Sequence, residues 1–427
     1  MEALYLFGFL LFFIAIGIPI AISLGMSSMI FIMLFGTSTL VFQARSVVTA
    51  VDSYPLLAVP LFILAGDLMY SGGLSKRIIS FADSLVGHFK AGLAHVNVLA
   101  STFFAAISGS SPATVAAIGT NMIPEMEKRN YSKEYSTSLT AASGMIGVLI
   151  PPSIPFIMYG ISAEQSVSVL FIAGIVPGLL FAAGFSFVAY LLYRKASIKA
   201  DSQAFSLANV GKTLKQAVWA LLAPFIILGG IYGGVMSPTE AAAVAVFYSL
   251  FVGVVVYRNL KVKDIFKVFV KSSLTSATVL ALVAFASTFG RLLTLEQVPA
   301  QIAGFLTSFT DNPIVLLLVI NIFLLFVGMF METVASIIIL TPILLPVVVQ
   351  MGVDPILFGV ILTVNLAIGF CTPPLGVNLF VASGISGLSI ERISKAIIPY
   401  FIVMIILLLL VTYIPVISLG LTRLITG

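Results

Sequence analysis

Hydroxyl, glycine and proline residues interrupt an apolar stretch at Ser108–Thr114, which reads SGSSPAT. Proline lacks an N–H and displaces the carbonyl four residues earlier, so Pro112 leaves the carbonyl of Ser108 without its helical partner. Such a carbonyl is costly in hydrocarbon unless another group satisfies it. A dehydrated cation held by carbonyl and hydroxyl oxygens would do so, and the stretch therefore predicts an ion site.

Two pairs of adjacent prolines predict similar breaks further along the chain, at Pro151–Pro152 and Pro373–Pro374. By the same rule they free four carbonyls, those of Gly147, Val148, Gly369 and Phe370. We predict a first Na⁺ site from the oxygens of Ser108, Ser110, Gly147, Ile150 and Pro152. We predict a second Na⁺ site from those of Phe330, Glu332, Thr333, Gly369, Thr372 and Pro374. The first set holds no carboxylate, which favours Na⁺ over a proton as the coupling ion.

Arg291 is an ionisable residue in an apolar setting, and such residues are functional candidates by default. Its guanidinium could bind a substrate carboxylate, reach the interface, or form a salt bridge with Asp67 or Glu332. The sequence leaves these alternatives open. Half-helices that begin after SGSS and METV would point the positive ends of their dipoles at the bilayer centre, which suits an anionic substrate.

The chain that positions these residues has the composition of a membrane protein. Of its 427 residues, 60% are hydrophobic and 9% are charged, whereas about a quarter of the residues of a soluble domain are charged. Ten of the 21 Lys and Arg residues lie in two short stretches, 194–215 and 258–271, which the positive-inside rule places in cytoplasmic loops. The basic charge therefore needs no nucleic-acid partner. One cysteine and two histidines exclude an internal disulfide and a His/Cys zinc site.

The prolines also reveal an internal repeat. The residues whose type recurs 222 positions later are Pro124, Gly147, Pro151, Pro152 and Pro177. The loop after Pro124 carries three basic residues, whereas the equivalent window, 347–356, carries none. Equivalent loops therefore face opposite sides of the membrane, which predicts an inverted-topology repeat.

We therefore predict an all-α polytopic membrane fold with about ten crossings and both termini outside. The two inverted repeats are expected at residues 1–215 and 216–427. Each contains a re-entrant helical hairpin, expected at 93–124 and at 314–346, and a broken helix, expected at 135–160 and at 356–382. Two amphipathic segments are expected to lie along the interface, at 74–90 and 261–271.

Several motifs in fixed order resemble the large membrane subunit of tripartite ATP-independent periplasmic (TRAP) transporters, the DctM family. They read PLFILAGDLM, SGSSPATVAAIG, IPPSIPFIMYG, SPTEAAA, GMFMETVASIIILTPILLP and CTPPLGVNLFVASGIS, and they span essentially the whole chain. The resemblance implies Na⁺-driven uptake of an organic acid across the bacterial inner membrane, with two Na⁺ sites at the hairpins. It also implies an elevator mechanism, in which a transport domain slides against a scaffold. One departure is METVAS, which stands where the first hairpin has SGSSPAT.

The same resemblance implies partners and a class of solute. The partners are a small four-helix membrane subunit and a periplasmic substrate-binding protein, and the only cofactor is Na⁺ as the coupling ion. Family members carry C4-dicarboxylates, sialic acid and other carboxylates, and this sequence looks similar to the sialic-acid branch. The residues expected near such an acid are Ser108, Ser110, Ser143, Arg291, Asn365 and Asn378.

Three other functions compete with this interpretation. A stand-alone Na⁺/dicarboxylate carrier shares the inverted-repeat physics but needs no binding protein, and an ion channel would use the same oxygen-lined sites. An intramembrane enzyme is disfavoured, because no His, Asp, Glu and Cys residues stand at catalytic spacing in the sequence.

Overall fold

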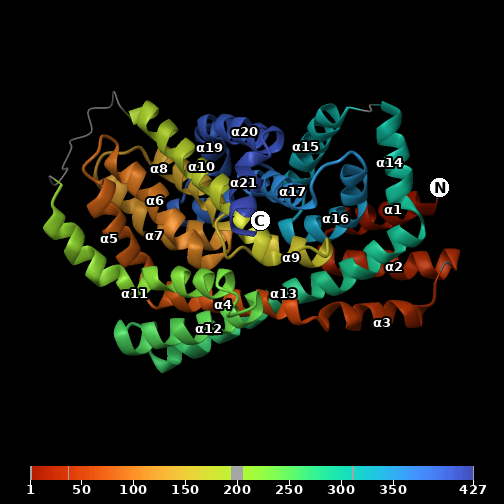
Figure 1. The fold of residues 1–427 in the computed structure, drawn as a ribbon, viewed down its shortest axis with the longest axis horizontal. Coiled ribbons are helices and arrows are strands. Elements are labelled where there is room, and N and C mark those ends of the chain that lie inside the picture. Colours follow the sequence, from red (N-terminus) through yellow and green to blue (C-terminus); the bar gives the residue numbers. More distant parts are fainter. Residues whose placement is uncertain (1, 37, 194–204, 310–311, 427) are drawn as a thin grey trace.

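The computed structural model describes residues 2–36, 38–193, 205–309 and 312–426. Within these ranges the chain consists of helices and their connections, without a β-strand (Figure 1). The prediction of an all-α membrane fold is confirmed. Seven of the described helices are long and apolar enough to cross a membrane, or eight if the bent pair α19–α20 counts as one span. This is fewer than the predicted ten crossings, and several other apolar helices of the described chain are only 10–17 residues long.

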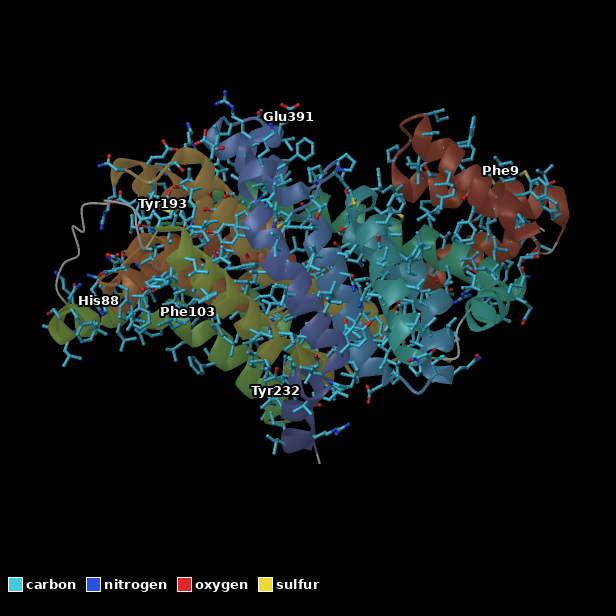
Figure 2. The ribbon with its side chains drawn as sticks, turned by 90° about the horizontal axis from the view of Figure 1, so that it is seen from above. Phe9, His88, Phe103, Tyr193, Tyr232 and Glu391 are labelled. Carbon is cyan, nitrogen blue, oxygen red and sulfur yellow. The ribbon has the colours of Figure 1, made fainter. Side chains whose placement is uncertain are left out.

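The first part of the chain extends across the molecule. Its helices are α1 (Glu2–Ala15), α2 (Ile20–Phe35), α3 (Leu40–Val51), the 3-10 helix η1 (Tyr54–Leu57), α4 (Ala58–Ser71) and α5 (Leu74–Val86). Figure 2 shows Phe9 of α1 and His88, just beyond α5, at opposite ends of the molecule. The segment from α1 to α5 therefore flanks the helices that carry the predicted sites.

The first hairpin consists of α6 (Gly92–Ser108) and α7 (Ser111–Lys128), close to the predicted bounds. Gly109 ends α6 in the left-handed region, at φ +60°, which glycine adopts without steric cost. The Ser110 hydroxyl then caps α7 by accepting from the Ala113 N–H. Pro112 lies in the first turn of α7, where its missing N–H removes no helical hydrogen bond. The sequence SGSSP thus ends one helix and begins the next.

The first broken helix follows directly. It comprises α8 (Lys133–Gly144), the 3-10 helix η2 (Met145–Val148) and α9 (Ile154–Ser162). Residues 149–153 between them are not helical, and the Pro151–Pro152 peptide bond is cis. The Ser153 hydroxyl caps α9 by accepting from the Phe156 N–H.

The second half repeats this arrangement. Its hairpin consists of α15 (Pro313–Phe330) and α16 (Thr333–Gln350), and its broken helix of α17 (Pro355–Gly369) and α18 (Val377–Ser386). The Pro373–Pro374 peptide bond is also cis. Both breaks therefore occur where the 222-residue repeat predicts them.

The remaining helices surround these elements. They are α10 (Val167–Tyr193), α11 (Leu207–Tyr232), α12 (Pro238–Phe251), the π-helix η3 (Val252–Val256), α13 (Val262–Leu295), α14 (Val298–Phe309), α19 (Ile390–Ala396), α20 (Ile398–Tyr413) and α21 (Val416–Thr426). The predicted boundary between residues 215 and 216 falls inside α11, so no break between elements marks it.

One helix differs from its prediction. Segment 261–271 is expected to lie separately along the interface, but 262–271 forms the first turns of α13, a helix of 34 residues in all. Its basic residues Lys263, Lys267 and Lys271 therefore lie on a helix rather than in a loop. Charge alone misplaced them, because the positive-inside rule does not separate a loop from the end of a helix. In Figure 1, α13 runs across the molecule from α12 to α14.

Candidate functional site

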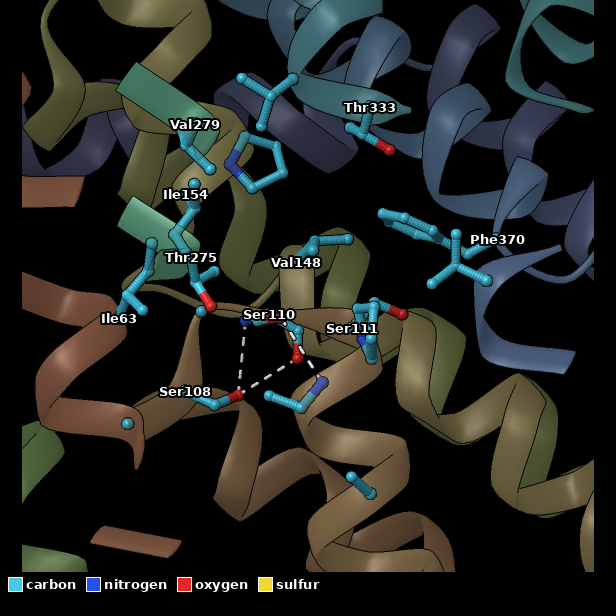
Figure 3. Close-up of a pocket in the computed structure, with 18 of the residues that line it drawn as sticks. Ile63, Ser108, Ser110, Ser111, Val148, Ile154, Thr275, Val279, Thr333 and Phe370 are labelled. Carbon is cyan, nitrogen blue, oxygen red and sulfur yellow. Dashed lines mark hydrogen bonds between the residues drawn. The ribbon is translucent and has the colours of Figure 1, made fainter. Parts of the chain in front are cut away.

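A cavity of about 420 Å³ lies where both hairpin tips and both broken helices approach α4 and α13. Figure 3 shows Ser108, Ser110 and Ser111 on one side, with Thr333 and Phe370 across from them. Helices α4 and α13 contribute Ile63, Gly66, Asp67, Lys271, Thr275 and Val279. Four of the predicted site residues line the cavity, namely Ser108, Ser110, Glu332 and Thr333.

Oxygen atoms converge at the tip of the first hairpin, and the sequence reasoning missed the residue at their centre. The Thr114 hydroxyl donates to the Ser110 carbonyl oxygen at 2.8 Å and lies 2.9 Å from Ser108 Oγ. Thr114 and Ser108 are buried. A signal for Thr114 was present, because a hydroxyl four residues after Ser110 faces back onto the same turn of a helix.

The first broken helix reaches this tip through backbone atoms. A Cβ at Gly147 would lie 2.5 Å from Thr114 Oγ1 and 2.6 Å from the Ser110 carbonyl oxygen. A Cβ at Gly109 would lie 2.6 Å from the Pro152 carbonyl oxygen. The structure therefore brings together four predicted residues of the first site, Ser108, Ser110, Gly147 and Pro152. The fifth, Ile150, is buried with its side chain against Gly178.

Three of the five carbonyls predicted to be free accept hydrogen bonds within the protein. The Val148 oxygen accepts from Ser153 Oγ at 2.6 Å, and the Phe370 oxygen from the Asn378 N–H at 3.0 Å. The Gly369 oxygen accepts from the Thr372 N–H at 3.1 Å. The prediction was wrong to leave them without partners, because neighbouring donors replace the N–H that proline removes.

The predicted second site is more open than the first. Thr333 is buried, but the side chain of Phe330 and both residues Pro373 and Pro374 are exposed. The Thr372 hydroxyl, three residues beyond α17, donates to the Ile368 carbonyl oxygen in the last turn of that helix at 2.9 Å. These residues therefore share a region without converging on one point.

Glu332 and Gly369 have structural contacts in this region. The Glu332 carboxylate caps α16 by accepting from the Ala335 N–H at 3.0 Å, as Ser110 caps α7. Gly369 packs so closely on the backbone of Gly328 that a Cβ would collide with the Gly328 carbonyl. The close contact joins α17 to α15.

A main-chain hydrogen bond joins the hairpin to the broken helix in each half. The Ile154 N–H donates to the Gly109 carbonyl oxygen at 3.2 Å in the first half. The Leu375 N–H donates to the Met329 carbonyl oxygen at 3.1 Å in the second. Ile154 begins α9 and Gly109 lies at the hairpin tip, whereas Leu375 lies two residues before α18 and Met329 in the last turn of α15.

Asn378, predicted near the substrate, connects the two halves of the chain instead. Its side-chain amide exchanges hydrogen bonds with Ser111 Oγ, at 2.8 and 3.0 Å, and donates to the Ala141 carbonyl oxygen at 2.9 Å. The residue is buried and does not line the cavity. It ties α18 to α7 and α8.

Asn365 and Ser143 occupy equivalent positions of the repeat and are also buried away from the cavity. Asn365 donates to Asn321 Oδ1 at 2.8 Å, and Asn321 donates to Thr412 Oγ1 at 3.0 Å. Among the described residues, Asn365 Oδ1 and Ser143 Oγ have no hydrogen-bond partner.

Arg291 lies outside the cavity, on the part of α13 that packs against α3. Its guanidinium donates to Ser46 Oγ at 3.3 Å. Asp67, one of its predicted partners, instead forms an ion pair with Lys271, with 2.7 Å between Oδ1 and Nζ. The salt bridge with Asp67, one of the alternatives for Arg291, is therefore not seen, because Lys271, 20 residues earlier on α13, is the basic residue that pairs with Asp67 of α4.

Comparison with known proteins identifies relatives of the whole chain. Residues 7–417 match the family described as "Tripartite ATP-independent periplasmic transporter, DctM component". The isethionate TRAP transporter permease protein DctMQ of Oleidesulfovibrio alaskensis is 47% identical over 96% of this chain, which spans 65% of that protein. The C4-dicarboxylate TRAP transporter large permease protein DctM of Pseudomonas aeruginosa is 42% identical, over 93% of each chain. The sialic acid TRAP transporter large permease protein SiaM of Vibrio cholerae is 38% identical, over 96% of each.

A solved structure has a related fold. The YdaH transporter of Alcanivorax borkumensis superposes with a TM-score of 0.60, covering 90% of this chain and 87% of that one, at 16% sequence identity. At this identity the likeness concerns the arrangement of the helices alone.

Proposed function

The chain belongs to the DctM family of TRAP transporters, and from this premise we propose that it couples organic-acid import to Na⁺. It is a multi-pass membrane permease and not an enzyme. The observation that supports Na⁺ coupling is the cluster of oxygens from Ser108, Ser110 and Thr114, against the backbone of Gly147 and Pro152. A hard monovalent cation favours such neutral oxygen ligands.

The proposed solute is a small organic acid that enters the cavity between the hairpin tips and α13. The relatives are named for isethionate, C4-dicarboxylates and sialic acid, so the sialic-acid branch is one of three candidates. A second support is that the helix N-termini of α7 and α16 lie at the cavity, where their dipoles favour a negative group.

We further propose the mechanism and the assembly that family membership implies. The hairpins and broken helices would move together as a transport domain. Helices α4 and α13 would belong to the scaffold, and the transport domain would slide against the scaffold along the face that holds the cavity. A small membrane subunit and a periplasmic binding protein would complete the transporter in the bacterial inner membrane, with both termini of this chain in the periplasm.

Uptake by proteoliposomes tests the proposal. The chain is reconstituted with its small subunit, and binding protein loaded with labelled isethionate, succinate or sialic acid is added outside. We expect one of these acids to accumulate inside against its own gradient when an inward Na⁺ gradient is applied. Equal uptake with K⁺ in place of Na⁺ would overturn the coupling. Uptake by this chain without its partners would favour the stand-alone carrier, and Na⁺ current without solute accumulation would favour a channel.

A further inference from the structure

Lys271 is the one cationic side chain among the described residues that line the cavity. It lies on the face of α13 that also presents Thr275 and Val279, at spacings of four residues. A helix places such residues one above another, so α13 offers a charge, then a hydroxyl, then an apolar group. The side chain of Lys271 is 66% exposed. Its ammonium is therefore accessible from the cavity.

Asp67, its partner, is held more firmly than Lys271. Its side chain is 16% exposed, and Oδ2 accepts from Ser272 Oγ at 2.8 Å while Oδ1 contacts the Lys271 ammonium. Asp67 therefore keeps a hydrogen bond if the ammonium moves away. Lysine has a flexible four-carbon stem and three donors, which suits a group that changes partner.

Glu332, the charged residue at the cavity besides Asp67 and Lys271, cannot bind an anion. Glu332 is an acid whose carboxylate caps α16. An anion that enters this space meets two carboxylates and one ammonium, and a charge leaving water needs a paired opposite charge. Lys271 is the group that can supply it.

We propose that the Lys271 ammonium exchanges partners during transport. It leaves Asp67 to bind the carboxylate or sulfonate of the solute, and Asp67 takes it back when the solute departs. This role rests on the function proposed above. It makes Lys271 a substrate-binding residue and Asp67 a competitor that promotes release.

The exchange predicts opposite effects from the two partners in the proteoliposome assay, with isethionate, succinate and sialic acid as probes. Lys271→Met is expected to raise KM about tenfold or more, the loss of one charge-assisted contact. Asp67→Asn is expected to lower KM, because the solute anion no longer competes with a carboxylate for the Lys271 ammonium. It is also expected to lower kcat, because Asp67 no longer promotes release of the solute. Lys267→Met, one turn earlier on α13 and outside the cavity, is the matched control and should leave both unchanged.

A swapped pair separates this role from a structural one. Asp67→Lys combined with Lys271→Asp restores an ion pair but puts the carboxylate at the exposed position. We expect this protein to reach the membrane and to import none of the probes. Recovery of uptake by the swap, an unchanged KM in Lys271→Met, or higher KM values in both single variants would overturn the exchange. Wild-type protein that imports no probe would instead overturn the proposed function.

Discussion

The two hairpins, α6–α7 and α15–α16, each meet a broken helix at a cis proline pair, but they bury the meeting point to different degrees. In the first half, Pro151 and Pro152 are buried and Thr114 joins the hairpin oxygens. In the second half, Pro373 and Pro374 are exposed and the Thr372 hydroxyl donates to the Ile368 carbonyl oxygen at the end of α17. The same sequence offset thus produces one compact set of oxygens and one dispersed set.

The difference follows from the residues at the hairpin tips. SGSSPAT provides three serines and a threonine, whereas METVAS provides one threonine, one serine and a carboxylate that caps α16. The Ser336 hydroxyl donates to the Glu332 carbonyl oxygen at 3.0 Å, as Thr114 does to that of Ser110, but no second hydroxyl among the described residues bonds to it. The comparison makes the first half the stronger candidate for the proposed Na⁺ site.

Added bulk at the two close-packed glycines should have the largest effects. Gly369→Ala places a Cβ against the Gly328 backbone, and Gly147→Ala places one against the Ser110 oxygen. Each is expected to destabilise the protein by about 1–3 kcal/mol, as overpacking does, and to lower its melting temperature in detergent. Gly384→Ala, whose Cβ would meet no atom within 4 Å, is the control and should be neutral. Equal melting temperatures for all three would contradict the packing account.

Removal of a single hydroxyl should distinguish the two ion sites. Thr114→Val is isosteric and removes the oxygen that contacts Ser108 and Ser110, so the Na⁺ concentration for half-maximal uptake should rise about tenfold or more. Ser336→Ala, the change at the equivalent position of the second half, removes the hydroxyl that donates to the Glu332 carbonyl oxygen and should raise it less. The reverse order would show that the second half holds the more demanding site.

Asn378→Leu should act on stability and not on solute binding. It leaves the Ser111 hydroxyl without a buried partner, which costs about 1–3 kcal/mol, while the Ala141 carbonyl keeps the Cys371 thiol as a donor at 3.3 Å. The melting temperature should fall while KM stays near the wild-type value. A raised KM at unchanged melting temperature would return Asn378 to the substrate site that its sequence position first indicated.

Ser153→Ala should have the smallest effect. It removes the donor to the Val148 carbonyl and the cap of α9, contacts worth about 0.5–2 kcal/mol. If the freed Val148 carbonyl instead became a ligand of Na⁺, the rate of uptake would rise more steeply with Na⁺ concentration. We expect only a lower melting temperature, because the carbonyl lies in a buried turn that water or a shifted side chain can satisfy.

Much of the architecture could be predicted from sequence because proline and glycine act locally. The offset of 222 residues placed both hairpins and both broken helices, since a break depends on the missing N–H and not on distant contacts. The proximity of Ser108, Ser110, Gly147 and Pro152 could be predicted for the same reason, because adjacent elements bring them together. Their proposed role in binding Na⁺ stays a prediction.

Long-range contacts could not be predicted in this way. Lys271 and Asp67 are 204 residues apart, and no local pattern distinguishes Lys271 from the other basic residues at the start of α13. The bridge from Asn378 to Ser111 spans 267 residues and likewise depends on how α18 packs on α7. Arg291 was prominent in the sequence because it stands alone among apolar residues, but its bond to Ser46 shows that isolation in sequence does not place a residue at a cavity.

The bonds from Ile154 to Gly109 and from Leu375 to Met329 involve peptide groups only. Side-chain replacement at these four positions cannot delete the donor or the acceptor, and proline at 154 or 375 is the one exception because it carries no amide hydrogen. In a saturation-mutagenesis survey scored by growth on the transported acid, both positions should accept many replacements and reject proline. Each hairpin would then remain bonded to its broken helix even when many of the surrounding side chains are replaced.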